Sequence, residues 1–218
     1  MLRDDEERAR SLGKLEVGLD ESYENVLGSI CQLSTWKSEL AYWVVEWLCC
    51  TLRPIKFNEL MTALELSKPE LYRSIKGLVS PLEIFQMFNG LVKWEEESGS
   101  VMFSHYPIKE LIISHRLKGT GAEPFQVDKE YTHGVITKLC LKYLLQRNPY
   151  MYSTEEELQE GLVNYPFLDY AAKSWVEHSQ NTGPNIELDS FIVKLLTYSQ
   201  NEEKYVYYEI LSLACGNK

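Results

Sequence analysis

A chain of 218 residues is long enough for one large domain or two small ones. Its 32 acidic and 22 basic side chains give a net charge of −10, which makes nucleic acid and anionic membranes poor partners for the chain as a whole. The sequence contains no run of about 18 apolar residues, the length needed to span a membrane. The highly charged start (MLRDDEER) is unlike a signal peptide, so we expect a cytoplasmic protein.

The chain begins with a polar arm, residues 1–18, followed by two amphipathic helices. Apolar side chains recur three and four residues apart from Tyr23 to Ile30, which predicts a helix with one buried stripe. The next helix begins near Thr35, and its apolar side chains cover more than one side. A helix with so much apolar surface is expected at the centre of a bundle, with Trp47 in the core.

Residues 53–115 predict a winged helix, in which several helices precede a β-hairpin. Asn58 is a predicted N-cap, and Pro69 and Pro81 mark helix starts because proline is favoured at the first helical position. The periodicity then changes to two short β-type runs within residues 91–103, joined by a polar turn that contains glycine. We expect these two runs to form the hairpin of the wing.

The clearest break in the sequence is the Gly- and Pro-containing stretch 119–124. The residues beyond it predict helices throughout. Asp128 is a predicted N-cap, and Thr154 with Glu157 has the spacing of a capping box. The last predicted helix includes residues 205–213. The expected fold class is therefore mainly α, a winged helix followed by an all-α bundle, with a polar arm at 1–18, a winged-helix domain at 19–118 and a helical domain at 119–218.

Four stretches resemble, in the same order, the region that follows the nucleotide-binding domain in fungal NACHT-type signalling ATPases of the NOD-like or STAND class. They are residues 19–27 (LDESYENVL), 44–48 with 53–60 (VVEWL and RPIKFNEL), 101–111 (VMFSHYPIKEL) and 165–178 (YPFLDYAAKSWVEH). The resembled region is also known as a GPI inositol-deacylase-type winged helix domain. The resemblance implies a regulatory, protein-binding module whose partner is a NACHT nucleotide-binding domain.

The same resemblance singles out His105, which follows the second predicted strand of the wing. STAND ATPases carry at this place the histidine of their MHD motif, and the resemblance implies contact with the β-phosphate of ADP on the nucleotide-binding domain. An imidazole can donate a ring N–H to a phosphate oxygen. Tyr106 stands where the plant and animal motif has Asp. The alternative is a structural His105 that supports the wing against Trp94 or the helix of Trp47.

Motifs for chemistry are absent from the sequence. The only Gly-Lys pair, Gly13-Lys14, lacks the other residues of a phosphate-binding loop, and no hydrolase, zinc-protease, Cys-x-x-Cys or dinucleotide fingerprint occurs. His178 is interpreted as a packing residue, and neither His115 nor His133 has a partner at the spacing of metal ligands. We therefore expect that the protein is not an enzyme and that it binds no metal or cofactor of its own.

The alternative function is a DNA-binding winged-helix transcription factor. The candidate recognition helix, residues 81–89, contains no basic side chain to meet bases or phosphates. The tip of the wing carries Glu95, Glu96 and Glu97, which repel a phosphate backbone. These charges favour a non-catalytic protein-interaction module over the DNA-binding alternative.

Overall fold

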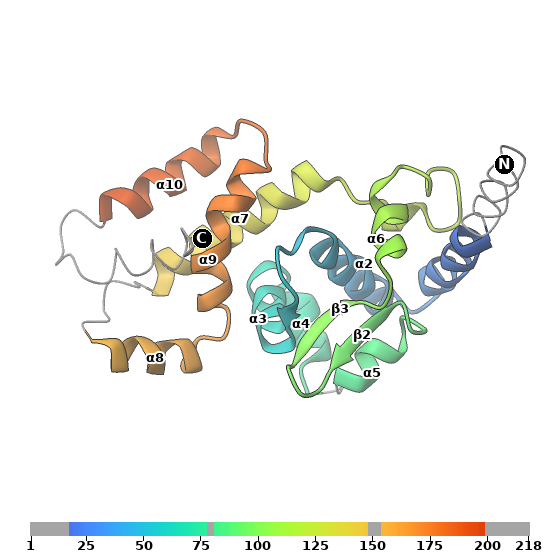
Figure 1. Cartoon of the computed structure of the whole chain (residues 1–218), viewed down its shortest axis with the longest axis horizontal. Coiled ribbons are helices and arrows are strands. Elements are labelled where there is room, and N and C mark those ends of the chain that lie inside the picture. Colours follow the sequence, from blue (N-terminus) through green and yellow to red (C-terminus); the bar gives the residue numbers. More distant parts are fainter. Residues whose placement is uncertain (1–17, 78–80, 148–153, 199–218) are drawn as a thin grey trace, which may run out of the picture. The chain divides into compact units, whose positions relative to one another are not determined.

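The computed structural model describes residues 18–77, 81–147 and 154–198. These residues are mainly helical, with a small three-stranded sheet of strand order β1-β3-β2 (Figure 1). The prediction of a mainly α chain that contains one β-hairpin is therefore confirmed. None of the described helices has both the length and the apolar character needed to cross a bilayer.

The described elements run in the following order along the chain. A helix that covers residues 18–31 comes first. It is followed by α2 (Thr35–Cys50), β1 (Ile55–Lys56), α3 (Phe57–Ser67), α4 (Pro69–Ile75), α5 (Pro81–Gln86), β2 (Val92–Glu95), β3 (Ser100–Phe103), α6 (Tyr106–Ile113), the 3-10 turn η1 (Glu123–Phe125), α7 (Lys129–Arg147), α8 (Glu155–Asn164), α9 (Leu168–Gln180) and α10 (Ile186–Tyr198).

The chain gathers into two compact units, each built from separate stretches. The first unit contains residues 1–49, 79–94 and 101–127, and the second contains 50–78, 95–100 and 128–218. The sequence instead predicted consecutive domains, with one boundary near residue 119. The second unit brings together residues 50–78 and the C-terminal helices, which are far apart in the chain. The contiguous domain boundaries stay a prediction.

The core of the first unit is built around α2. Trp47 is only 2% exposed, and its ring lies 5.2 Å from that of Trp43, one helical turn earlier. The ring centroids of Tyr42 and Phe125 lie 4.7 Å apart in an edge-to-face arrangement, so that η1 packs against the same helix. The prediction that α2 is central and that Trp47 lies in the core is confirmed.

Several predicted helix starts are confirmed by the local hydrogen bonds. Pro69 is the first residue of α4. The Asp128 carboxylate accepts the backbone N–H of Tyr131 at 3.1 Å at the start of α7. The Thr154 hydroxyl accepts the backbone N–H of Glu157 at 3.2 Å at the start of α8. The predicted helix through 205–213 lies outside the described residues.

The prediction that Asn58 caps α3 was wrong, because the helix begins one residue earlier, at Phe57. Lys56 occupies the N-cap position in an extended conformation. Its backbone N–H donates to the carboxylate of Glu59 at 2.8 Å, which is the reach-back bond of a capping box. This bond places Glu59 at the centre of the polar contacts described next.

Candidate functional site

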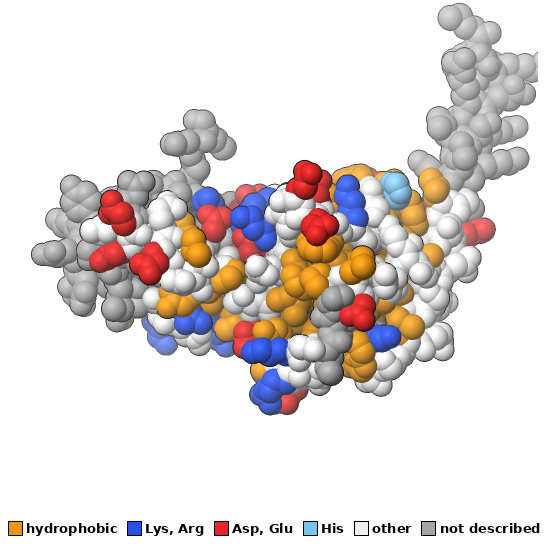
Figure 2. Space-filling view, turned by 90° about the horizontal axis from the view of Figure 1, so that it is seen from below, with side chains coloured by type: hydrophobic (Ala, Val, Ile, Leu, Met, Phe, Trp, Pro, Cys, Tyr) orange, Lys and Arg blue, Asp and Glu red, His pale blue; other side chains and the backbone are white. Residues whose placement is uncertain are grey.

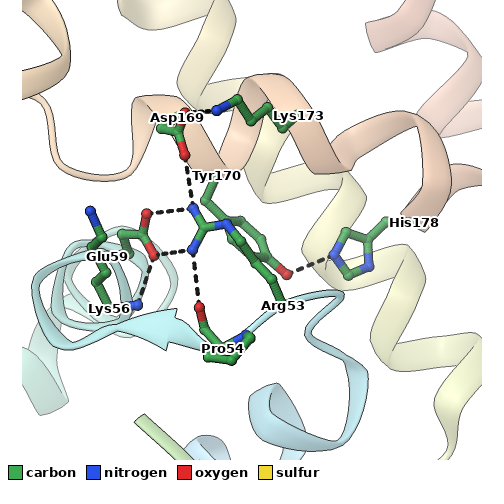
Figure 3. Close-up of polar contacts among 8 residues, drawn as sticks. All are labelled: Arg53, Pro54, Lys56, Glu59, Asp169, Tyr170, Lys173 and His178. Carbon is green, nitrogen blue, oxygen red and sulfur yellow. Dashed lines mark hydrogen bonds and ion pairs between the residues drawn. The ribbon is translucent and has the colours of Figure 1, made fainter. Parts of the chain in front are cut away.

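Buried polar side chains are concentrated in the second unit. Among the described residues, the buried polar or charged side chains are Ser38 in the first unit and Glu59, Thr132, His133, Thr137, Ser174 and His178 in the second. Figure 3 shows that two of these, Glu59 and His178, belong to one set of contacts that also includes Arg53 and Tyr170. We call the set Arg53, Glu59, Asp169, Tyr170, His178 and His133 the polar network.

The first part of the polar network is a forked ion pair. Arg53 lies in the turn before β1, and its Nη1 and Nη2 donate to the two oxygens of Glu59 at 2.9 and 2.7 Å. The Glu59 side chain is 3% exposed and also accepts the Lys56 backbone N–H. A buried carboxylate is costly unless it is paired and hydrogen-bonded, and a bidentate guanidinium meets both needs. The pair therefore holds the start of α3 against the preceding turn.

Arg53 extends the polar network from α3 to α9. Its Nη2 also donates to Asp169 at 3.0 Å, and the other carboxylate oxygen of Asp169 contacts Lys173 at 2.6 Å. Burial by itself lowers the pKa of Arg53. The hydrogen bond and charge of Glu59, followed by the charge of Asp169, outweigh burial and raise the pKa above its usual value. Arg53 is thus a permanent cation that joins α9 to the start of α3.

Tyr170 connects this ion-pair cluster to two histidines. The guanidinium carbon of Arg53 lies 5.1 Å from the centre of the Tyr170 ring, and the Tyr170 hydroxyl lies 2.9 Å from Nε2 of His178. Nδ1 of His178 lies 2.7 Å from Nδ1 of His133, which belongs to α7. Tyr170 and His178 are both 0% exposed, and His133 is 5% exposed. Both ring nitrogens of His178 are therefore used in hydrogen bonds inside the protein.

Burial decides the protonation of this part of the network. Burial, followed by the nearby charge of His133, lowers the pKa of His178 to about 3. His178 lies in the last turn of α9, where a helix dipole favours a cation by about 0.3–1 kcal/mol. The lowered pKa corresponds to a free-energy cost of roughly 5 kcal/mol for protonating His178, which exceeds the contribution of the helix dipole. Burial is also the main cause that raises the pKa of Tyr170, ahead of the Cys140 thiol.

A tyrosine hydroxyl on a neutral imidazole has the donors and acceptors of an acid–base pair, but catalysis also needs access to a substrate. Tyr170 and His178 are fully enclosed, and Glu59 is nearly so. Across the described ranges, no three His, Cys, Asp or Glu side chains are placed to hold a metal ion. The arrangement can therefore hold helices together, and the protonation of its histidines can change with pH.

His105 lies elsewhere, in the first unit. It occupies the N-cap position of α6 in an extended conformation, and its exposed side chain makes no capping hydrogen bond. Tyr106 beside it is 70% exposed. The acidic residues of the predicted wing tip, 95–97, are exposed as well. A role of His105 toward nucleotide stays a prediction.

Sequence reasoning missed most of the polar network. His133 was expected to have no partner at the spacing of metal ligands, and this stays a prediction. Its hydrogen bond to His178 was not foreseen, because the two residues are 45 apart and no local spacing reveals the contact. His178 is buried, as a packing residue is, but it also carries two hydrogen bonds. One signal was present: Glu59 stands beside Leu60 in the buried stripe of α3, and a carboxylate in that place requires a cation.

The fold defines a mainly helical protein with a small sheet, and comparison with known proteins adds one relative. Neither a family model nor a solved structure matches the chain. The chain is 26% identical over 206 residues to "Azaphilone pigments biosynthesis cluster protein L" of Monascus ruber, an alignment that covers 87% of this chain. It spans 41% of the relative's length. The name assigns that relative to a pigment biosynthesis cluster and specifies no reaction.

Proposed function

We propose that the chain is a non-catalytic, regulatory module that binds another protein. The observation that carries this proposal is the exposure of His105 and Tyr106 at the start of α6, directly after the β2–β3 hairpin. An exposed aromatic side chain beside a histidine with no capping bond provides both apolar contact area and hydrogen-bonding groups to a partner. The module would act in the cytoplasm.

We propose that the region from α3 to β3 is a winged helix and that α7 to α10 form the helical domain after it. Three helices, α3 to α5, precede the β2–β3 hairpin, and β1 extends the sheet on the β3 side. This order of elements supports a winged helix. The resemblance to NACHT-type signalling ATPases then supports a nucleotide-binding domain as the partner, with ADP held by that domain rather than by this chain.

The polar network supports the non-catalytic part of the proposal. The Glu59 carboxylate is engaged by the Arg53 fork and by the Lys56 backbone, and His178 is engaged at both ring nitrogens. Both side chains are also buried, at 2% and 0% exposed, so they are not placed to meet a substrate. The network therefore contributes to the rigidity of the second unit.

The DNA-binding alternative receives less support. Helix α5, in the place of a recognition helix, has only six residues, and its exposed side chains include Leu82 and Glu83. The exposed acidic turn 95–97 would meet phosphates with like charge. In the second unit, α8 exposes Glu156, Glu157 and Glu160, and Figure 2 shows acidic side chains gathered over that helix.

The test is a calorimetric titration of the full chain with a NACHT nucleotide-binding domain of the resembled fungal ATPases. We expect binding when that domain holds ADP, weaker binding when it holds an ATP analogue, and loss of this difference in His105→Ala. His115→Asn is the matched control, because His115 is also exposed and its positive φ of 60° suits asparagine. Absence of association in both nucleotide states, or salt-dependent binding to duplex DNA, would overturn the proposal.

A further inference from the structure

We propose that the His133–His178 contact is a proton-sensitive joint that holds α7 to α9 at neutral pH and releases the two helices on acidification. This regulation is a property of the second unit alone. It does not depend on which partner the chain binds, so its test can fail while the proposed function stands.

The geometry of the contact sets how many protons it can hold. The two Nδ1 atoms are 2.7 Å apart, so one of them donates a hydrogen and the other accepts it. The contact needs one hydrogen between the two rings, and two neutral imidazoles provide it. If both rings are protonated, each Nδ1 carries a hydrogen and the contact becomes a clash between two cations. The second proton therefore cannot be accommodated without separation of α7 from α9.

The first proton is also opposed, because His178 is 0% and His133 only 5% exposed, and a cation buried there loses its hydration. From α9, Tyr170 places its hydroxyl at 2.9 Å on the other ring nitrogen of His178. From the turn before β1, the Arg53 cation lies over that tyrosine, and from α7 the Cys140 thiol is fully buried nearby. The acidic groups of the network, Glu59 and Asp169, are already paired with Arg53.

The position of the joint gives it leverage over the helices. His133 is the fifth residue of α7, and His178 is two residues before the last residue of α9. The start of α7 therefore lies at the end of α9. Separation there exposes the Tyr170 hydroxyl, and the ring of Tyr170 also stacks on Phe167 at 5.6 Å. Release of the joint is thus expected to loosen α9 along its length up to Phe167.

The direction of the effect follows from linkage. The pKa of His178 is lowered from 6.5 to about 3 by folding, so the unfolded chain binds this proton more readily between those values. The stabilisation is fully present above pH 6.5 and is lost as the pH falls toward 3. Through His178 alone, acidification from pH 7 to pH 5 is expected to increase the equilibrium constant for opening by about 25-fold.

The experiment is native-state hydrogen exchange of the full chain at pH 7 and pH 5, corrected for the intrinsic exchange rate. For the amides of α7 and α9, we expect the equilibrium constant for opening to increase between pH 7 and pH 5. The increase should be about 25-fold in the wild type and less than about 3-fold in His178→Gln. Glutamine can keep a hydrogen bond to Tyr170 but does not titrate. His115→Asn, which removes an exposed imidazole outside the proposed binding surface, is expected to show the same increase as the wild type.

A second variant keeps the test decisive if His178→Gln does not fold. In His133→Asn, the amide oxygen can accept a hydrogen from a protonated His178. The acid-induced increase in the equilibrium constant for opening of α7 and α9 is therefore expected to be smaller than in the wild type. The His178 ring resonance, followed by NMR, should change only together with loss of α9 protection. Equal increases in wild type and the folded variant, or titration of His178 near pH 6.5 with α9 protection retained, would overturn the proposal.

Discussion

The two units bury different kinds of side chain. Of the seven polar or charged side chains that are buried among the described residues, six lie in the second unit and only Ser38 lies in the first. The first unit is held by apolar and aromatic contacts around α2. The second unit adds an ion-pair cluster and a histidine pair to its apolar core. One chain thus combines a core whose stability is set by packing with one whose stability is also set by charge.

This difference implies different responses to pH. Burial, followed by the neighbouring Cys31 thiol, raises the pKa of Tyr42 in the first unit to about 12, so this group stays neutral throughout the physiological range. In the second unit, His178 is neutral only while the unit remains folded around it. We therefore expect mild acid to loosen the second unit before the first.

The largest expected effect is that of Trp47→Ala in the first unit. Removal of a side chain that is 2% exposed leaves a large cavity beside Trp43, and we expect a loss of about 3–5 kcal/mol in the free energy of unfolding. Because no titratable group is removed, the loss should be the same at pH 7.5 and pH 5.5. Urea denaturation at both pH values measures it, and a loss below about 1 kcal/mol would contradict a packing-based core.

Arg53→Met tests the charged core of the second unit. It leaves the Glu59 carboxylate buried without its cation, and we expect a loss of about 2–3 kcal/mol, since Arg53 itself is partly exposed. Addition of Glu59→Leu should recover part of this loss because the unpaired charge is gone. The control is Arg73→Met, which breaks the exposed Arg73–Glu70 pair and should cost less than about 0.5 kcal/mol. Equal losses from Arg53→Met and Arg73→Met would show that the network is not stabilising.

The sequence predicted the helices and strands better than it predicted the side-chain contacts that join one helix to another. Apolar periodicity identified α2 and α7, and proline and capping residues identified the starts of α4 and α8. Such signals act within a few residues, so one sequence is sufficient to show them. The hairpin was equally local, because its two β-type runs flank one turn.

The polar network could not be predicted in the same way. Arg53 and Asp169 are 116 residues apart, and His133 and His178 are 45 apart. Only the packing of α9 against α7 and against the turn before β1 brings them together. The burial of Glu59 could have been inferred from its place in the buried stripe of α3, but the stripe does not say which of 22 basic side chains neutralises it.

Gly134→Ala probes the packing of α7 near the histidine pair. Alanine favours a helix over glycine by about 1 kcal/mol, but a new Cβ would lie 2.9 Å from the Thr182 hydroxyl oxygen. These effects should nearly cancel in the single variant. In a Thr182→Ala background the obstacle is removed, and the same change should stabilise the second unit by about 0.5–1 kcal/mol. Thermal denaturation of the four proteins decides it, and a loss in the Thr182→Ala background would mean that α7 is constrained by other contacts.

The smallest expected effect on stability is that of His105→Ala. The side chain is exposed and does not cap α6, so its removal should change the free energy of unfolding by less than about 0.5 kcal/mol. A His105 that supported the wing against Trp94 or α2 would instead cost well over 1 kcal/mol when truncated, because packed contacts would be lost. Urea denaturation of His105→Ala beside His115→Asn separates these outcomes. A stability equal to that of the control would leave the imidazole available to a partner, in contrast to the histidines that hold α7 to α9.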